Sequence, residues 1–198
     1  MYTAETESSS PWRGAVAGAI GGIVGSAAMV AFNHLLARAG VGAGDHGRHH
    51  QERRADAKPN DSDGTTPDEP ASRKAASRAA EGVTGEPLSE RGKDAAGALV
   101  HYGFGAAAGA FYGATAAVSP NVTMGTGIPY GAAVFLAATE AGLPSLGLAR
   151  KPTEYPASRH LTALASHIVY GVTLEAVRHL LMRHTRARQP YDMTALGV

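Results

Sequence analysis

Long apolar stretches alternate with short polar ones along this chain, and the pattern predicts helices that cross a membrane. Residues 14–36 carry no charged side chain, and residues 95–139 contain no Asp, Glu, Lys or Arg. A helix at the surface of a soluble protein needs a polar face, which these stretches lack. At about 1.5 Å of rise per residue, the first stretch is long enough to cross a hydrocarbon core of roughly 30 Å.

Four such segments predict an all-α fold, an integral membrane four-helix bundle. We expect Thr126 to cap the third helix, and we expect Pro144 to leave residues 142–147 kinked or irregular, because proline cannot continue a regular helix without cost. The four predicted spans are residues 14–36, 95–118, 129–144 and 157–181.

A polar segment separates the first predicted span from the other three. It is rich in charge, Gly, Pro, Asp and Ser and has almost no large apolar residue, so it is predicted to be a disordered linker. Only the piece ASRKAASRAAE is expected to form a transient helix. The chain therefore divides into an N-terminal tail with the first span (1–39), the linker (40–86), a helical membrane domain (87–184) and a C-terminal tail (185–198).

Small residues recur at intervals of four along the predicted helices. They are Gly18 and Gly22 in the first span and Gly105, Gly109 and Gly113 in the second. Lipid provides no hydrophobic drive for helix association, so close packing across small residues takes its place. These glycines are therefore expected to pack helices, within the chain or between copies in a homo-oligomer, rather than to form a dinucleotide loop.

Ionisable residues within predicted spans are costly and therefore point to function. If the helices alternate in direction, four of them fall in one half of the bilayer, at depths within roughly 10 Å of each other. This candidate polar cluster consists of His34, His101, Glu140 and His167, with His160 at its edge. A second ionisable pair, Glu175 and Arg178, shares one helix face near the other side and is expected to pair internally or with the interface.

Three roles are open for the candidate polar cluster. Imidazole titrates near neutral pH, so the cluster could relay protons. Neutral imidazole and carboxylate also bind Zn or Fe, and His101 with His167 could ligate haem. The third role is structural, with each histidine bonded to a helix carbonyl. A short tract in the linker, His46, His49 and His50, could bind metal weakly.

Composition excludes several classes of function. The chain has no cysteine, so it has no disulfide and no thiolate site. Lys and Arg total 18 against 17 Asp and Glu, a formal net charge of +1, and the basic residues of the linker are mixed with acids, which argues against nucleic acid. No hydrolase triad or phosphate loop is present. We therefore expect a protein that is not an enzyme, has no catalytic residue and needs no cofactor.

The stretch from Leu88 to Arg183 resembles the YagU family of bacterial inner-membrane proteins, whose biochemical function is not established. Four segments carry the resemblance: HYGFGAAAGAFYGA, GTGIPYGAAVFLAATEAGLPSLGL, KPTEYPASRH and SHIVYGVTLEAVRHLLMR. The resemblance implies an integral inner-membrane protein without a demonstrated catalytic role. It favours His101, Glu140 and His167 as positions worth testing.

Together these observations predict a small multi-pass protein of the bacterial cytoplasmic (inner) membrane, acting in envelope or proton/ion homeostasis. Its partners are expected to be the lipid bilayer and further copies of itself. Arg13 and the arginines near the C-terminus favour both termini in the cytoplasm. The alternatives are a redox protein that binds metal or haem through intramembrane histidines, and a structural or partner-binding module.

Overall fold

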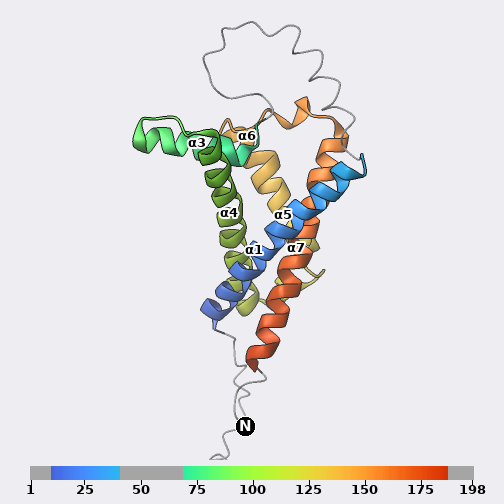
Figure 1. Ribbon diagram of the computed structural model, residues 1–198. Helices are drawn as coiled ribbons and strands as arrows, with labels where there is room; N and C mark the ends of the chain where they lie inside the picture. The colour runs from blue at the N-terminus through green and yellow to red at the C-terminus, as the bar shows by residue number, and fades with distance from the viewer. Residues whose placement is uncertain (1–9, 41–68, 187–198) are drawn as a thin grey trace, which may run out of the picture.

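The computed structural model describes residues 10–40 and 69–186, and over these residues the protein is helical and contains no strand. The long helices follow one another in alternating directions, and a short helix lies across one end of them (Figure 1). In chain order the elements are α1 Pro11–Arg38, α3 Ala71–Thr84, α4 Glu90–Val118, the 3-10 turn η1 Pro120–Thr123, α5 Ile128–Val134, the π-helix η2 Phe135–Gly142, α6 Leu143–Ser145, the 3-10 turn η3 Pro152–Glu154 and α7 Ala157–Arg186.

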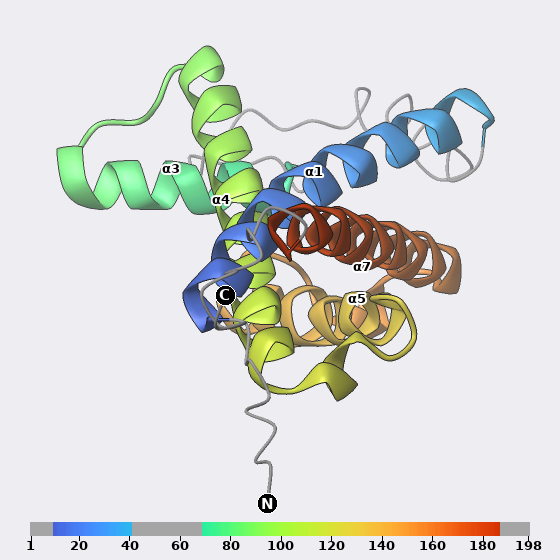
Figure 2. The same cartoon turned by 90° about the horizontal axis from the view of Figure 1, so that it is seen from below.

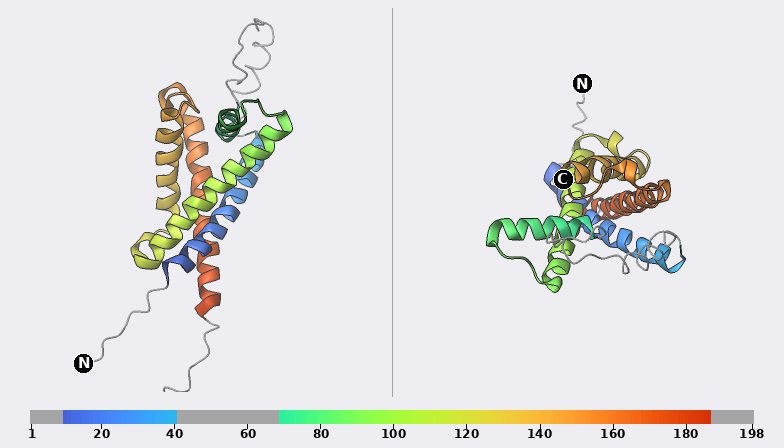
Figure 3. Two further views of the ribbon diagram at one scale, coloured as in Figure 1. Left: turned by 90° about the vertical axis from the view of Figure 1, so that its left-hand side faces the viewer. Right: turned by 90° about the horizontal axis from the view of Figure 1, so that it is seen from above.

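Helix α1 is the centre of the arrangement. It runs beside α4 along one side and crosses α7 on the other, and α5 packs against α7 (Figures 2 and 3). The segment α5–η2–α6 runs back toward the end where α4 begins and α7 starts. We call this the α3 end of the bundle, because α3 lies across it; the turn η1 lies at the opposite end.

Local chemistry sets the helix boundaries. The Ser89 hydroxyl accepts a hydrogen bond from the Gly92 amide at 3.2 Å, which caps α4 as a serine at this position commonly does. Helix α4 ends before Ser119, whose backbone is extended, as expected of a residue that precedes proline. The prediction that Thr126 caps the third helix is wrong. The cap position is Gly127, whose φ of 85° favours glycine.

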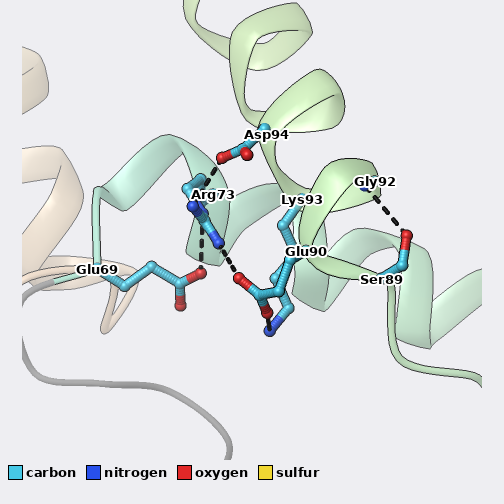
Figure 4. A network of polar contacts seen from close by, with 7 residues as sticks. All are labelled: Glu69, Arg73, Ser89, Glu90, Gly92, Lys93 and Asp94. Carbon is cyan, nitrogen blue, oxygen red and sulfur yellow. Dashed lines mark hydrogen bonds and ion pairs between the residues drawn. The ribbon is translucent and has the colours of Figure 1, made fainter.

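Part of the predicted disordered linker is helical instead. Helix α3 occupies residues 71–84, and its residue Arg73 donates to Glu69 at 3.2 Å and to Glu90 and Asp94 at 2.7 Å each (Figure 4). The helix covers the piece ASRKAASRAAE, where the sequence indicates a transient helix, and extends three residues further. The prediction of disorder is wrong for residues 71–84 because ion pairs hold this polar segment without a large apolar core. Residues 41–68, including the histidine tract, and residues 187–198 of the C-terminal tail lie outside the described residues.

The third predicted span is continuous but irregular over a wider range than expected. The irregularity covers the whole of η2, eight residues of π-helix that begin well before the predicted 142–147. Pro144 follows η2 and has no N–H to donate to a carbonyl in the preceding turn, which favours a wider turn there. The π geometry matters for the site because both Thr139 and Glu140 lie within it.

The glycines that the sequence singles out meet at the crossing of α1 and α4. A Cβ atom on Gly18 would collide with the carbonyl of Gly109, and one on Gly22 would collide with the carbonyl of Gly105. Gly113 faces Gly14 in the same way. The backbones of the two helices therefore touch directly. Because these faces are used within the chain, they are closed to the alternative of contacts between copies.

The packing places small residues inside and many large apolar residues outside. The fully buried large side chains are few, with Tyr112 and Leu174 at 0% exposure. Large apolar residues exposed along the bundle include Val16, Ile20, Leu99, Phe104, Phe111, Leu136, Val172 and Leu180. A soluble protein seldom exposes so many such residues together.

Among the described helices, α1 alone is both long and apolar enough to be a candidate membrane span. Glycine, histidine and tyrosine lower the mean hydropathy of α4, and Glu175 and Arg178 do the same for α7. The third span is divided among α5, η2 and α6, which follow one another without a break but have eight residues or fewer each.

Candidate functional site

A cavity of about 340 Å³, lined by both polar and apolar side chains, opens at the α3 end of the bundle. We call it the end cavity. Helix α3, the π-helix η2, helix α6, the loop that follows it and the start of α7 all contribute to its wall. The polar and aromatic lining residues are Glu69, Lys74, Thr139, Glu140, Arg150, Tyr155, Arg159 and His160.

Helix α3 is fixed over the end cavity by two arginines. Arg73 joins it to the first turn of α4 through Glu90 and Asp94 (Figure 4). This hydrogen bonding raises the pKa of Arg73, and hydrogen bonds from Lys93 and Arg73 lower the pKa of Glu90. Arg78 donates to the backbone carbonyls of Leu146 and Gly147 at 2.9 and 3.0 Å, just after α6. The cavity therefore has a wall that is tied to two different parts of the bundle.

The side chain of His160 bridges two acceptors in the end cavity. Its Nδ1 lies 2.8 Å from Oε1 of Glu140, and its Nε2 lies 3.0 Å from the backbone carbonyl of Pro152. A carbonyl oxygen can only accept, so Nε2 carries a proton. On the other side, Nδ1 either donates to the Glu140 carboxylate, as part of an imidazolium, or accepts from the Glu140 carboxyl group, as part of a neutral ring.

The residue before Glu140 reaches a second histidine. The Thr139 hydroxyl lies 3.3 Å from Nε2 of His167, and Nδ1 of His167 lies 2.8 Å from the carbonyl of Ala163. The carbonyl can only accept, so Nδ1 carries a proton, and Nε2 either accepts from the Thr139 hydroxyl or donates to it. The π-helix η2 thus turns two successive residues toward two histidines of α7.

The candidate polar cluster is only partly assembled. His101, on α4, lies close enough to His167 to interact with it electrostatically, and its Nε2 is buried without a hydrogen-bond partner among the described residues. His34 is exposed on α1. Glu140 bonds to His160, which the sequence placed only at the edge of the cluster. Within the described part of the chain, no three His, Asp or Glu residues are grouped as metal ligands.

The contact between Glu140 and His160 can be predicted from their positions on either side of a loop, although their estimated depths in the membrane do not single out this pair. The two residues lie on consecutive helices on either side of the loop that contains Pro144 and Pro152. Residues at matching distances from such a loop meet when the helices are antiparallel. Distance from the connecting loop therefore predicts which side chains meet more precisely than estimated depth within the bilayer does.

The second ionisable pair lies deeper in the molecule. Arg178 donates to both carboxylate oxygens of Glu175, at 2.6 and 2.7 Å, and both residues are buried. The guanidinium carbon lies 6.0 Å from the ring centre of the fully buried Tyr112. A bidentate pair is the arrangement in which a buried arginine and glutamate best offset their loss of water.

Residues 85–176 match a protein family described as "Protein of unknown function (DUF1440)". The match spans α4 to most of α7 and includes His101, Glu140, His160 and His167, but not α1 or α3. The match confirms that a domain of unknown function lies in the region where the sequence resembles the YagU family. The YagU-like name itself stays a prediction. No curated protein and no solved structure matches the chain.

Proposed function

We propose that this is a non-enzymatic, multi-pass protein of a bacterial inner membrane that takes up and releases protons at the Glu140–His160 pair, in the service of proton or ion homeostasis. The observation that carries the proposal is the placement of His160 between a carboxylate and a backbone carbonyl. The membrane location and the proton-binding role have separate support.

Support for a lipid environment comes from the inverted packing. Glycine backbones meet at the α1–α4 crossing, whereas large apolar residues such as Phe104 and Phe111 are exposed. Burial of small residues with exposure of large ones is the arrangement favoured when the surroundings are themselves apolar. Trp12, 67% exposed at the start of α1, would lie at a membrane interface, where tryptophan is enriched.

Support for proton binding comes from the hydrogen-bond geometry. A single proton on the line between Nδ1 of His160 and Oε1 of Glu140 can belong to either group, giving an ion pair or a neutral pair. Both states keep the hydrogen bond, since donor and acceptor simply exchange roles. The pair lines the end cavity, so water has access to it.

A row of polar groups leads from this pair into the bundle. Thr139 precedes Glu140 on η2 and bonds to His167, beside which His101 lies. Further along, the Tyr170 hydroxyl donates to the carbonyl of Gly105 at 2.7 Å. Nε2 of His101 has no hydrogen-bond partner among the described residues, so protons could pass along this row only with water bridging the groups, and that water would enter at the end cavity.

The experiment is a proton-flux measurement in liposomes that contain the purified protein and an internal pH-sensitive dye. With an imposed membrane potential, the unaltered protein is expected to acidify or alkalise the lumen faster than empty liposomes. Glu140→Gln and His160→Asn are each expected to abolish most of this difference, because either change removes one of the two groups between which the proton is exchanged.

The matched control is His34→Asn, which alters an exposed histidine outside the end cavity. It is expected to conduct protons as the unaltered protein does. Equal flux in the unaltered protein, Glu140→Gln and His160→Asn would overturn the proposed proton-binding role. So would an unaltered protein no more permeable than empty liposomes.

A further inference from the structure

The end cavity carries more positive charge than its own carboxylates neutralise. Lys74 of α3, Arg150 of the loop and Arg159 of α7 all line it. The two lining carboxylates are already engaged, Glu69 with Arg73 and Glu140 with His160. Three cations from three separate elements therefore face a space in which no described carboxylate pairs with them.

Tyr155 organises two of these cationic residues. Its hydroxyl oxygen accepts a hydrogen bond from the backbone N–H of Arg150 at 3.1 Å. The guanidinium of Arg159 lies 3.9 Å from the centre of its ring, close enough for a cation–π contact. The hydroxyl proton of Tyr155 remains available to a further acceptor, because the bond from Arg150 uses only the oxygen. The ring of His160 packs edge-on at 6.4 Å.

The size and position of the cavity narrow the class of ligand. A volume of about 340 Å³ lies at the lower end of the range of small-molecule sites, which suits a compact ligand. Guanidinium groups match the oxygen geometry of phosphate, and lysine adds a point charge. The cavity lies at the end of the bundle, where the charged residues of the chain resume after the uncharged stretch.

We propose that the end cavity binds a phosphate-bearing anion through Lys74, Arg150 and Arg159, with the Tyr155 hydroxyl as an additional donor. Two sources share this chemistry, a free phosphate and the headgroup of an anionic phospholipid. In either case the negative oxygens replace the carboxylates that the three cations lack. Basic pockets between membrane helices recognise anionic headgroups on the same principle.

The test uses the full-length protein in a neutral detergent and isothermal titration calorimetry with inorganic phosphate. In a second arm the probe is short-chain phosphatidylglycerol, with zwitterionic short-chain phosphatidylcholine for comparison. Arg159→Gln and Arg150→Gln are each expected to weaken binding by about tenfold, the loss typical of one charge-assisted hydrogen bond. Arg91→Gln, which alters an exposed arginine of α4 outside the cavity, is the control and is expected to bind normally.

If both phosphate and phosphatidylglycerol bind, the cavity recognises the phosphate group itself. If phosphatidylglycerol binds and inorganic phosphate does not, the ligand is the lipid headgroup. The proposal is overturned if neither probe binds, if phosphatidylcholine binds equally well, or if the arginine variants bind like Arg91→Gln. Circular dichroism checks that each variant is folded, and Tyr155→Phe, which keeps the ring, provides a second variant with an expected loss. A protein that binds phosphate but conducts no protons would contradict the proposed function and leave this proposal standing.

Discussion

Glu90 gives the clearest pH-dependent consequence at the scale of a single residue. Its pKa in the folded protein is lowered, chiefly by the hydrogen bonds from Lys93 and Arg73. A lowered pKa means that the folded state binds the proton less tightly than the unfolded state does. The resulting stabilisation is fully present above the ordinary glutamate pKa of about 4.3, and it is lost as the pH falls through the lower value of the folded protein.

The contact between His160 and Glu140 is tested in NMR spectra of protein with labelled histidines. In Glu140→Gln the titration midpoint of the His160 ring is expected to move down, because the neutral amide no longer favours the imidazolium. His34→Asn leaves the midpoint of His160 in place. An unchanged midpoint in Glu140→Gln would show that the carboxylate does not hold the imidazolium.

Individual side chains are where the sequence predicts least. Position within a predicted span singles out Glu140, and in the structure its side chain bonds to His160 at the α3 end of the bundle. Which way a side chain points on a helix depends on the turn that carries it, and a π-helix changes that direction. Nothing in the residues of η2 predicts eight residues of π geometry.

At the scale of secondary-structure elements, the α1–α4 crossing depends on the absence of side chains. A Cβ atom on Gly109 would collide with the carbonyl of Gly18 and come within 2.9 Å of the Cα of Gly22. Gly109→Leu is therefore expected to destabilise the protein by at least about 2 kcal/mol, the cost of overpacking a tight contact. Thermal unfolding in detergent, followed by circular dichroism, measures the change.

The matched control lies on the same helix. Gly103 has open space around it, and a Cβ atom at this position would meet no neighbouring atom within 4 Å. Gly103→Leu is expected to leave stability unchanged or raise it slightly, because leucine favours a helix over glycine by up to about 1 kcal/mol. Equal destabilisation by the two changes would mean that the crossing is not a close glycine contact.

Helix α3 depends on Arg73. Arg73→Ala removes the links to Glu69, Glu90 and Asp94 and is expected to speed hydrogen exchange of the α3 amides severalfold, with little change in α1 or α7. The control is Arg91→Ala, which removes an exposed arginine from the first turn of α4, next to Glu90. Unaltered exchange in α3 after Arg73→Ala would show that other contacts hold the helix.

The elements differ in how far the sequence predicts them. The ranges 14–36, 95–118 and 157–181 all fall within long helices, because uncharged or nearly uncharged stretches of that length leave few alternatives. Helix α3 was missed as a stable element because alanine, serine and arginine bury little surface, and its anchoring depends on carboxylates further along the chain. Long-range ion pairs of this kind have no local signature.

At the scale of the whole molecule, the outer surface of the bundle is expected to face lipid. The chain has no cysteine, so a single introduced cysteine reports on one position. Phe111 and Leu136 are 69% and 59% exposed on the bundle, and Val83 is 86% exposed on α3, outside the predicted spans. If the bundle lies in a membrane, the first two positions contact lipid and the third contacts water.

The most direct measurement is labelling of these three single-cysteine variants with a membrane-impermeant maleimide in native membranes made permeable by freezing and thawing. We predict that Val83→Cys reacts readily, whereas Phe111→Cys and Leu136→Cys react only after the membranes are dissolved and the protein is unfolded in dodecyl sulfate. Labelling of Phe111→Cys and Leu136→Cys as fast as Val83→Cys in intact membranes would contradict a lipid-embedded bundle.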